Sequence, residues 1–165
     1  MAKRDTVKFT SGSGSLLSTS CLNVSDPVGP GQLNNMGDVM LVQAMLYLIA
    51  KYYGGPTRIG LTSTNEVPEP TGQWNEKTAY AIRRYQNKHR PRMIKKVVDG
   101  VVHPADYQNR QVLLTATSPL MTITQLHEDM VDTSINGGFD DGADGYTWGI
   151  IRMVPQLLPF LLFPI

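Results

Sequence analysis

Cysteine is almost absent from this sequence, since Cys21 is the only one in 165 residues. A single cysteine can form neither an internal disulfide framework nor a cysteine-rich zinc site. His89, His103 and His127 are scattered and do not form the HExxH pattern of zinc proteases. The GxSxG elbow of serine hydrolases and the P-loop of nucleotide-binding enzymes are also missing. We therefore expect no metal, no cofactor and no enzymatic activity.

An excess of either charge is lacking too, because 15 basic and 14 acidic side chains leave a net charge of +1. A chain this close to neutral has no overall field that attracts nucleic acid or an anionic membrane. One local basic run could contact phosphates, and it contains Lys88, Arg90, Arg92, Lys95 and Lys96. Because no aromatic residues are interleaved with these cations, we do not expect nucleic acid as a partner.

Long apolar runs are missing as well. No segment approaches the roughly 20 apolar residues that cross a bilayer, so we expect no transmembrane segment. The basic N-terminus is not followed by the apolar stretch of a signal peptide. We therefore expect a chain that is made in the cytoplasm without a signal peptide.

Residues 131–165 are expected to form a Gly/Asp loop and an apolar tail, which prolines at 155, 159 and 164 interrupt. Since proline prevents a continuous helix, one interpretation is an extended tail that fills a groove on a protein partner. An equally favoured interpretation is that the tail folds back on its own domain. The expected assembly contacts are Leu157, Leu158, Phe160, Leu161, Leu162 and Phe163.

Residues 1–33 are rich in Ser, Gly and Pro, which predicts an irregular N-terminal arm. A helix is predicted over residues 38–53, with Asn34 or Asn35 as its cap and glycines at its end. The helical spacing of its apolar residues predicts one buried stripe. That stripe consists of Val39, Val42, Met45, Leu46 and Ile49.

A second helix is predicted over residues 75–88. Asn75 is a typical cap, and Glu76 suits the positive end of the helix dipole. Gly72 favours a turn before this helix, and Trp74 can pack against the helix entry. One face of the helix is apolar and is expected to meet the first helix. It consists of Thr78, Ala81, Ile82 and Tyr85.

Shorter signals follow the second helix. The β-prone residues around Asp99–Gly100 predict a short hairpin or a turn. Pro104 suits the first position of a third helix over residues 105–114. Residues 120–131 fit either a short helix or a strand. The predicted fold class is mainly α, with a small three-helix bundle over residues 34–130.

Three segments occur in the order NNMGDVMLVQAML, TGQWNEKTAYAIRRYQ and VDGVVHPAD. Together they resemble the peptidoglycan-binding domain family, a small three-helix module attached to many cell-wall hydrolases. The resemblance covers residues 34–107, with a longer stretch before Gly72 and a basic insertion before Asp99. Most of the matching positions are interpreted as structural. They are Asp38, Val39, Val42, Gln43, Leu46, Gly72, Trp74, Thr78, Ala81, Ile82, Tyr85, Gln86, Asp99, Gly100 and Pro104.

Peptidoglycan offers sugar faces, amides and the carboxylates of its stem peptides. On the second helix, Tyr80, Arg83, Arg84 and Asn87 share one outward side because of their i, i+3, i+4 and i+7 spacing. The planar fork of arginine suits a carboxylate, and the tyrosine offers a face for stacking. The hypothesis is therefore a ligand site at these four residues. The alternative is a solvated or protein-contacting face.

The resemblance implies a non-catalytic module that is built into or delivered by a larger assembly. A phage particle or a contractile injection machine would carry such a module to the cell wall, so we expect its final site in a virion, an injection machine or the cell envelope. One alternative is a purely structural subunit without sugar binding. A second alternative is a wall-targeting accessory of a separate lytic enzyme.

Overall fold

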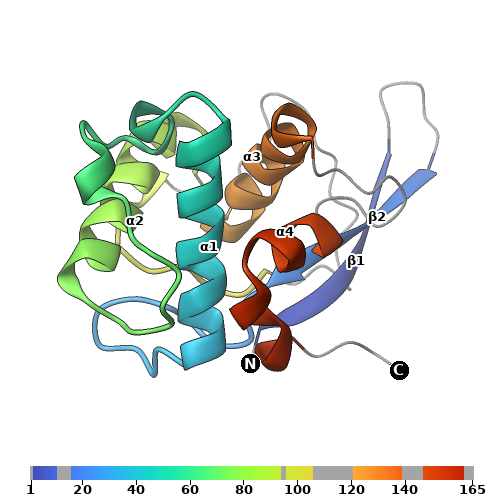
Figure 1. The fold of residues 1–165 in the computed structure, drawn as a ribbon, viewed down its shortest axis with the longest axis horizontal. Helices are drawn as coiled ribbons and strands as arrows, with labels where there is room; N and C mark the ends of the chain where they lie inside the picture. Colours follow the sequence, from blue (N-terminus) through green and yellow to red (C-terminus); the bar gives the residue numbers. More distant parts are fainter. Residues whose placement is uncertain (1, 11–15, 94–95, 106–120, 139–146, 162–165) are drawn as a thin grey trace.

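The computed structural model describes residues 2–10, 16–93, 96–105, 121–138 and 147–161. This part of the chain is mainly helical, as predicted (Figure 1). Its helices are α1 (Met36–Tyr52), α2 (Glu76–His89), α3 (Thr122–Gly137) and the short α4 (Thr147–Met153). Short 3₁₀ turns connect or extend them: η1 (Pro56–Ile59), η2 (Thr64–Glu66), η3 (Arg90–Arg92) and η6 (Pro155–Phe160).

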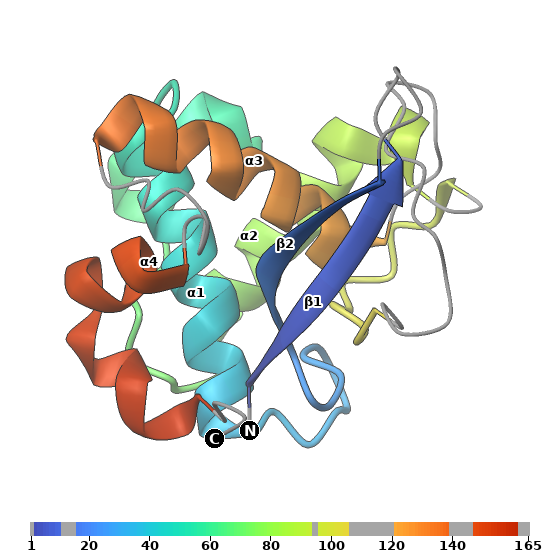
Figure 2. The ribbon, with the colours of Figure 1, turned by 90° about the vertical axis from the view of Figure 1, so that its right-hand side faces the viewer.

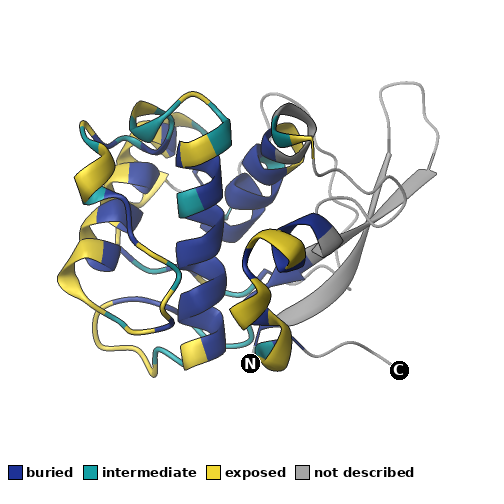
Figure 3. Cartoon of the chain, viewed as in Figure 1, coloured by how far each residue is buried: buried dark blue, intermediate teal, exposed yellow. Residues whose placement is uncertain are grey.

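Helix α1 is the centre of the fold and is buried on nearly all sides (Figure 3). The prediction of one buried stripe was therefore too narrow, because α3, η1 and η6 surround this helix. Its N-terminus also differs from the prediction. Asn35 occupies the cap position without a side-chain capping bond, and its amide donates to the Asp26 carboxylate at 2.7 Å. The buried Asp38 accepts from the backbone N–H of Ser25 at 2.9 Å, which ties the preceding segment to α1.

Helix α2 begins as predicted, because the Asn75 side chain accepts from the N–H of Thr78 at 2.8 Å. Its residues Ile82 and Tyr85 lie in the same hydrophobic core as Val42, and Trp74 packs against that core while partly exposed. The main helical neighbour of α1 is nevertheless α3 rather than α2. The sequence predicted that α2 packs mainly on α1, but the apolar periodicity of α2 identifies only its buried face and not the helix that this face contacts.

The third helix of the described bundle is α3, which resolves the ambiguity over residues 120–131 in favour of a helix. The helix predicted over 105–114 lies outside the described residues, apart from Ala105. Around Asp99–Gly100 the chain forms a turn with a positive φ of 76° at Gly100. Instead of closing a hairpin, Val102 pairs with Val28 through backbone hydrogen bonds of 3.0 and 2.8 Å.

The prediction of an irregular arm over residues 1–33 is wrong for residues 3–10 and 16–23, whereas residues 24–33 form neither a helix nor a strand. Strands β1 (Lys3–Thr10) and β2 (Leu16–Asn23) form an antiparallel pair, in register from Lys3 opposite Asn23 to Thr10 opposite Leu16. Threonines, Val7 and Phe9 favour strands, and this preference outweighs the Ser/Gly composition that suggested irregular structure. Figure 2 shows the two strands crossing in front of α2 and beside α3.

The prediction of an extended C-terminal tail is also wrong, because residues 155–160 form η6 beside α1 and α4. Leu157 and Leu161 are buried in the core, Phe160 is partly buried against it and Leu158 is 46% exposed. Gly37 makes this close approach possible, because a Cβ there would lie 2.6 Å from Phe160 Cβ. The tail thus folds back on its own domain. Leu162 and Phe163 lie outside the described residues.

We predict that truncation after Met153 unfolds the protein. It removes Val154, Leu157 and Leu161 from the core. At ~1.5–3 kcal/mol for each fully buried side chain, the loss is about 5 kcal/mol or more. Circular dichroism during urea titration measures the effect. Leu158→Ala, at a 46% exposed position of the same segment, is the control and should leave the transition midpoint close to that of the unaltered chain. A truncated chain with an unchanged midpoint would show that the tail is not part of the core.

Candidate functional site

A buried glutamine holds the turn that precedes α2. The side-chain oxygen of Gln43 accepts from the N–H of Gly72 at 2.8 Å, and its amide nitrogen donates to the Gln73 carbonyl and to the Thr78 hydroxyl, both at 2.9 Å. Gly72 has a φ of 78°, and a Cβ there would lie 2.6 Å from Met36 Cγ, so a larger residue does not fit. The glutamine thus fixes the start of α2 relative to α1.

A second buried glutamine repeats this arrangement one helix further along the chain. The side-chain oxygen of Gln86 accepts from the N–H of Gly100 at 2.8 Å. Its amide nitrogen lies 3.0 Å from the Thr122 hydroxyl, 3.0 Å from the Val101 carbonyl and 3.1 Å from Asp99 Oδ1. Gln43, Gly72 and Thr78 therefore correspond to Gln86, Gly100 and Thr122. The sequence contained both glycine turns and both glutamines, but it did not connect them.

We predict that Gln86→Leu destabilises the fold by about 3 kcal/mol. The buried polar groups of Gly100, Val101 and Thr122 would lose their hydrogen-bond partner, at a cost of ~1–3 kcal/mol each. Relaxation of the surrounding structure would offset part of this cost. Chemical denaturation measures the change. The same substitution at the exposed Gln73 is the matched control, with an expected effect within about 0.5 kcal/mol. Equal effects at the two positions would contradict a structural role for the buried amide.

The four residues predicted as a ligand site lie on the outer side of α2, and all are exposed. The structure does not leave them equally free. Arg84 donates from Nε to the Gly60 carbonyl at 2.8 Å, and its guanidinium lies 6.0 Å from the Tyr80 ring centre. Arg83 instead lies beside the Gly100 turn. Arg84 therefore leans towards Gly60, the residue after η1, whereas Arg83 borders the Gly100 turn.

Other cations along this side of α2 are held by backbone carbonyl groups. Lys88 donates to the Thr57 carbonyl at 2.6 Å, and Arg90 donates from Nε to the Lys96 carbonyl at 3.2 Å. Carbonyl oxygens orient these cations without neutralising them. The outer side of α2 is therefore a basic ridge with an aromatic ring and an amide on it. We call Tyr80, Arg83, Arg84, Asn87, Lys88 and Arg90 the α2 ridge.

Asp99 is the carboxylate of the turn next to the ridge, and its hydrogen-bond partners are Gln86, Val101 and His103. Its Oδ1 accepts from the N–H of Val101 at 2.9 Å, and its Oδ2 lies 3.3 Å from His103 Nε2. Partial burial alone would raise the pKa of Asp99, but the hydrogen bonds from Val101 and Gln86 outweigh it and lower the pKa below its usual value. Asp99 is therefore an ionised residue that shapes the turn.

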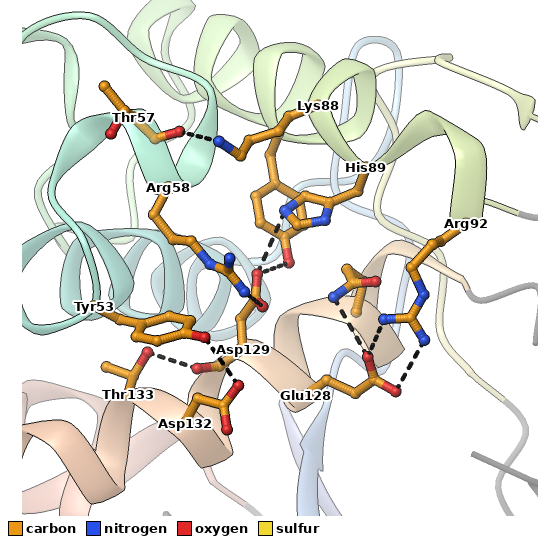
Figure 4. A network of polar contacts seen from close by, with 12 residues as sticks. Tyr53, Thr57, Arg58, Lys88, His89, Arg92, Glu128, Asp129, Asp132 and Thr133 are labelled. Atoms are coloured by element: carbon orange, nitrogen blue, oxygen red, sulfur yellow. Dashed lines mark hydrogen bonds and ion pairs between the residues drawn. The ribbon is translucent and has the colours of Figure 1, made fainter. Parts of the chain in front are cut away.

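Behind the ridge lies a polar network that the sequence analysis missed (Figure 4). Asp129 of α3 is 2% exposed and accepts from Arg58 Nη2 at 2.8 Å and from the Tyr85 hydroxyl at 2.7 Å. His89 Nε2 lies 3.5 Å from the same carboxylate, and the Arg58 guanidinium stacks 4.2 Å from the Tyr53 ring centre. Because its residues come from η1, α2 and α3, the network joins these three elements and supports the ridge from below.

Burial dominates the protonation of this region. It lowers the pKa of His89, with Arg58 and Lys88 lowering it further against the opposing effect of Asp129. Burial and the charge of Asp129 raise the pKa of the Tyr85 hydroxyl well above its usual value. His127 of α3 is buried, and this burial lowers its pKa to about 4. Tyr85, His89 and His127 are all buried, so their ring groups form part of the packing between the helices.

We predict that acid weakens the fold between pH 6.5 and 4. Below pH 6.5 the unfolded chain protonates His127 while the folded chain, with a pKa of about 4, does not. Stability from this residue is therefore lost as pH falls, by roughly 3 kcal/mol in total at 1.36 kcal/mol per pKa unit. Urea denaturation at several pH values measures the slope. It should become shallower in His127→Gln but not in His103→Gln, where the side chain is 49% exposed. Identical slopes would contradict this origin.

Glu66, in the loop between η1 and α2, closes a capping box at η2. Its carboxylate accepts hydrogen bonds from the N–H groups of Thr62 and Ser63 and from the Thr62 hydroxyl. Together these three bonds lower the pKa of Glu66. A carboxyl group that is held ionised in this way is unsuited to act as a general acid.

Comparison of the chain with protein-family models, curated proteins and solved structures found no match in any of the three. Among the helices that the structure describes, none combines the length and apolar character that a bilayer-spanning segment requires. The geometry of the α2 ridge and its supporting turns is therefore the basis for the functional argument.

Proposed function

We propose that this chain is a non-catalytic module that binds peptidoglycan through Tyr80, Arg83 and Asn87 of the α2 ridge. A larger assembly, such as a phage particle or a contractile injection machine, would carry it to the cell wall. The observation that carries the proposal is the exposed set of Tyr80, Arg83 and Asn87 on one rigid helix. Such a set offers an aromatic face, a guanidinium and an amide, which match the sugars, carboxylates and amides of the wall polymer.

The support beneath the ridge strengthens this proposal. Two glutamine-held turns and the Asp129 network fix α2 on both sides, so the ridge residues need little ordering of the backbone when a ligand binds. The duplicated glutamine, glycine and threonine contacts also agree with the resemblance to peptidoglycan-binding domains. Of these residues, Thr122 lies outside the segments on which the resemblance was drawn.

A purely structural subunit is the second candidate. Two apolar residues near the N-terminal end of α1 are exposed, Leu33 at 80% and Met36 at 52%. Leu158 of η6, the segment that packs on Gly37 through Phe160, is 46% exposed. Exposed apolar residues of this kind are typical of protein interfaces. They also support attachment of a wall-binding module to its carrier.

We predict that the full-length chain pellets with purified, insoluble peptidoglycan. Insoluble cellulose, which has sugar rings but no peptides, should leave the protein in the supernatant. Tyr80→Ala should weaken wall binding several-fold, because a stacked aromatic face contributes ~0.5–1.5 kcal/mol. Met153→Ala, at an exposed position on α4, is the control and should bind normally. Full-length protein that stays in the supernatant with both polymers would refute wall binding and favour the structural subunit.

A further inference from the structure

Among the arginines of α2 and η3, Arg83 differs in what its guanidinium contacts. Arg84 and Arg90 donate to backbone carbonyl groups, and Arg92 forms a 2.6 Å ion pair with Glu128. Arg83 is exposed, and within the described part of the chain it has no hydrogen bond or ion pair. The fork of Arg83 is therefore the guanidinium on this surface that is available to a ligand.

The position of Arg83 is nevertheless well defined. Its side chain lies across Gly100, where a Cβ would come within 3.0 Å of Arg83 Nε and 3.2 Å of Arg83 Cγ. The N–H of Gly100 is fixed in turn by Gln86, one turn of α2 further along. The nearby Asp99 is engaged by Val101, Gln86 and His103. The absence of a Cβ at Gly100 thus makes room for the Arg83 side chain, and among the described residues Asp99 forms no ion pair with Arg83.

We infer that Arg83 recognises an unamidated carboxylate of the wall peptide, whereas Arg84 has a structural role. This inference rests on the proposed wall binding and names the chemical group that the ridge selects. One uncommitted guanidinium matches one carboxylate, which it can bind through two parallel N–H···O bonds. Asn87, one turn further along the same side, can donate an additional N–H to the ligand. Arg84, Lys88 and Arg90 each donate to a backbone carbonyl oxygen, so Arg83 is the ridge arginine whose donors have no protein partner among the described residues.

The test measures binding of the full-length chain to three preparations of the same peptidoglycan. In the first, carbodiimide and ammonia convert the carboxylates to amides. The second receives ammonia without carbodiimide. The third is extracted to remove phosphodiester polymers. We expect amidation to weaken binding at least tenfold, and we expect the other two treatments to leave binding within twofold of the untreated wall.

Four variants separate the roles of the residues. Arg83→Gln should bind untreated walls at least tenfold more weakly than the unaltered chain and should not distinguish untreated from amidated walls. Arg83→Lys, which keeps the charge but loses the fork, should bind at an intermediate level. Arg84→Gln should bind within twofold of the unaltered chain while melting at a lower temperature. Lys77→Gln removes one charge from an exposed position of the same helix and should bind normally.

The possible outcomes distinguish the two proposals. Binding that survives amidation or the Arg83→Gln substitution would overturn the carboxylate inference and leave wall binding intact. Binding that is lost only after phosphodiester extraction would also overturn it, in favour of a phosphate ligand. Equal losses in Arg84→Gln and Arg83→Gln would contradict the division of roles. No binding to any preparation would overturn wall binding itself, and the carboxylate inference with it.

Discussion

The fold depends on two buried glutamine side chains that each accept a hydrogen bond from a glycine N–H. In both cases the glycine has a positive φ, and its N–H would otherwise be buried without a partner. Gln43 and Gln86 also reach the threonine near the start of the following helix, so one side chain sets both the turn and the helix entry. This constraint determines how α1, α2 and α3 follow one another.

The same constraint shapes the surface chemistry. Helix α2 is fixed between the residues after η1 on one side and the Gly100 turn on the other, and its outer cations lean towards one or the other. Carbonyl groups occupy Arg84 and Lys88, while a glycine leaves room for Arg83. Residues that share one side of a helical wheel thus differ in function because of the loops that border the helix.

The sequence was sufficient for features that depend on neighbours along the chain. The cap at Asn75, the turns at Gly72 and Gly100 and the mainly helical class follow from local preferences. It was insufficient where distant residues decide. In the Asp129 network, Arg58 and Asp129 are 71 positions apart, and no spacing pattern connects them. The N-terminal strands were misread because the Ser/Gly composition was given more weight than the β-prone residues on either side of it. The prolines of the tail excluded a long helix but allowed the 3₁₀ turn that covers α1.

The contact between the N-terminal segment and residues 101–105, which includes the Val28–Val102 pair, has a consequence for how the molecule folds. Asn23 exchanges hydrogen bonds of 2.7 and 3.1 Å with the backbone of Ala105, across 82 residues of sequence. Such long-range closure carries a loop-entropy cost and slows folding relative to a bundle of local contacts. The core around α1 also needs residues near the C-terminus, since Leu157 and Leu161 both belong to it. During translation, α1 therefore emerges from the ribosome long before the residues that shield it, and its apolar surface stays exposed until they arrive.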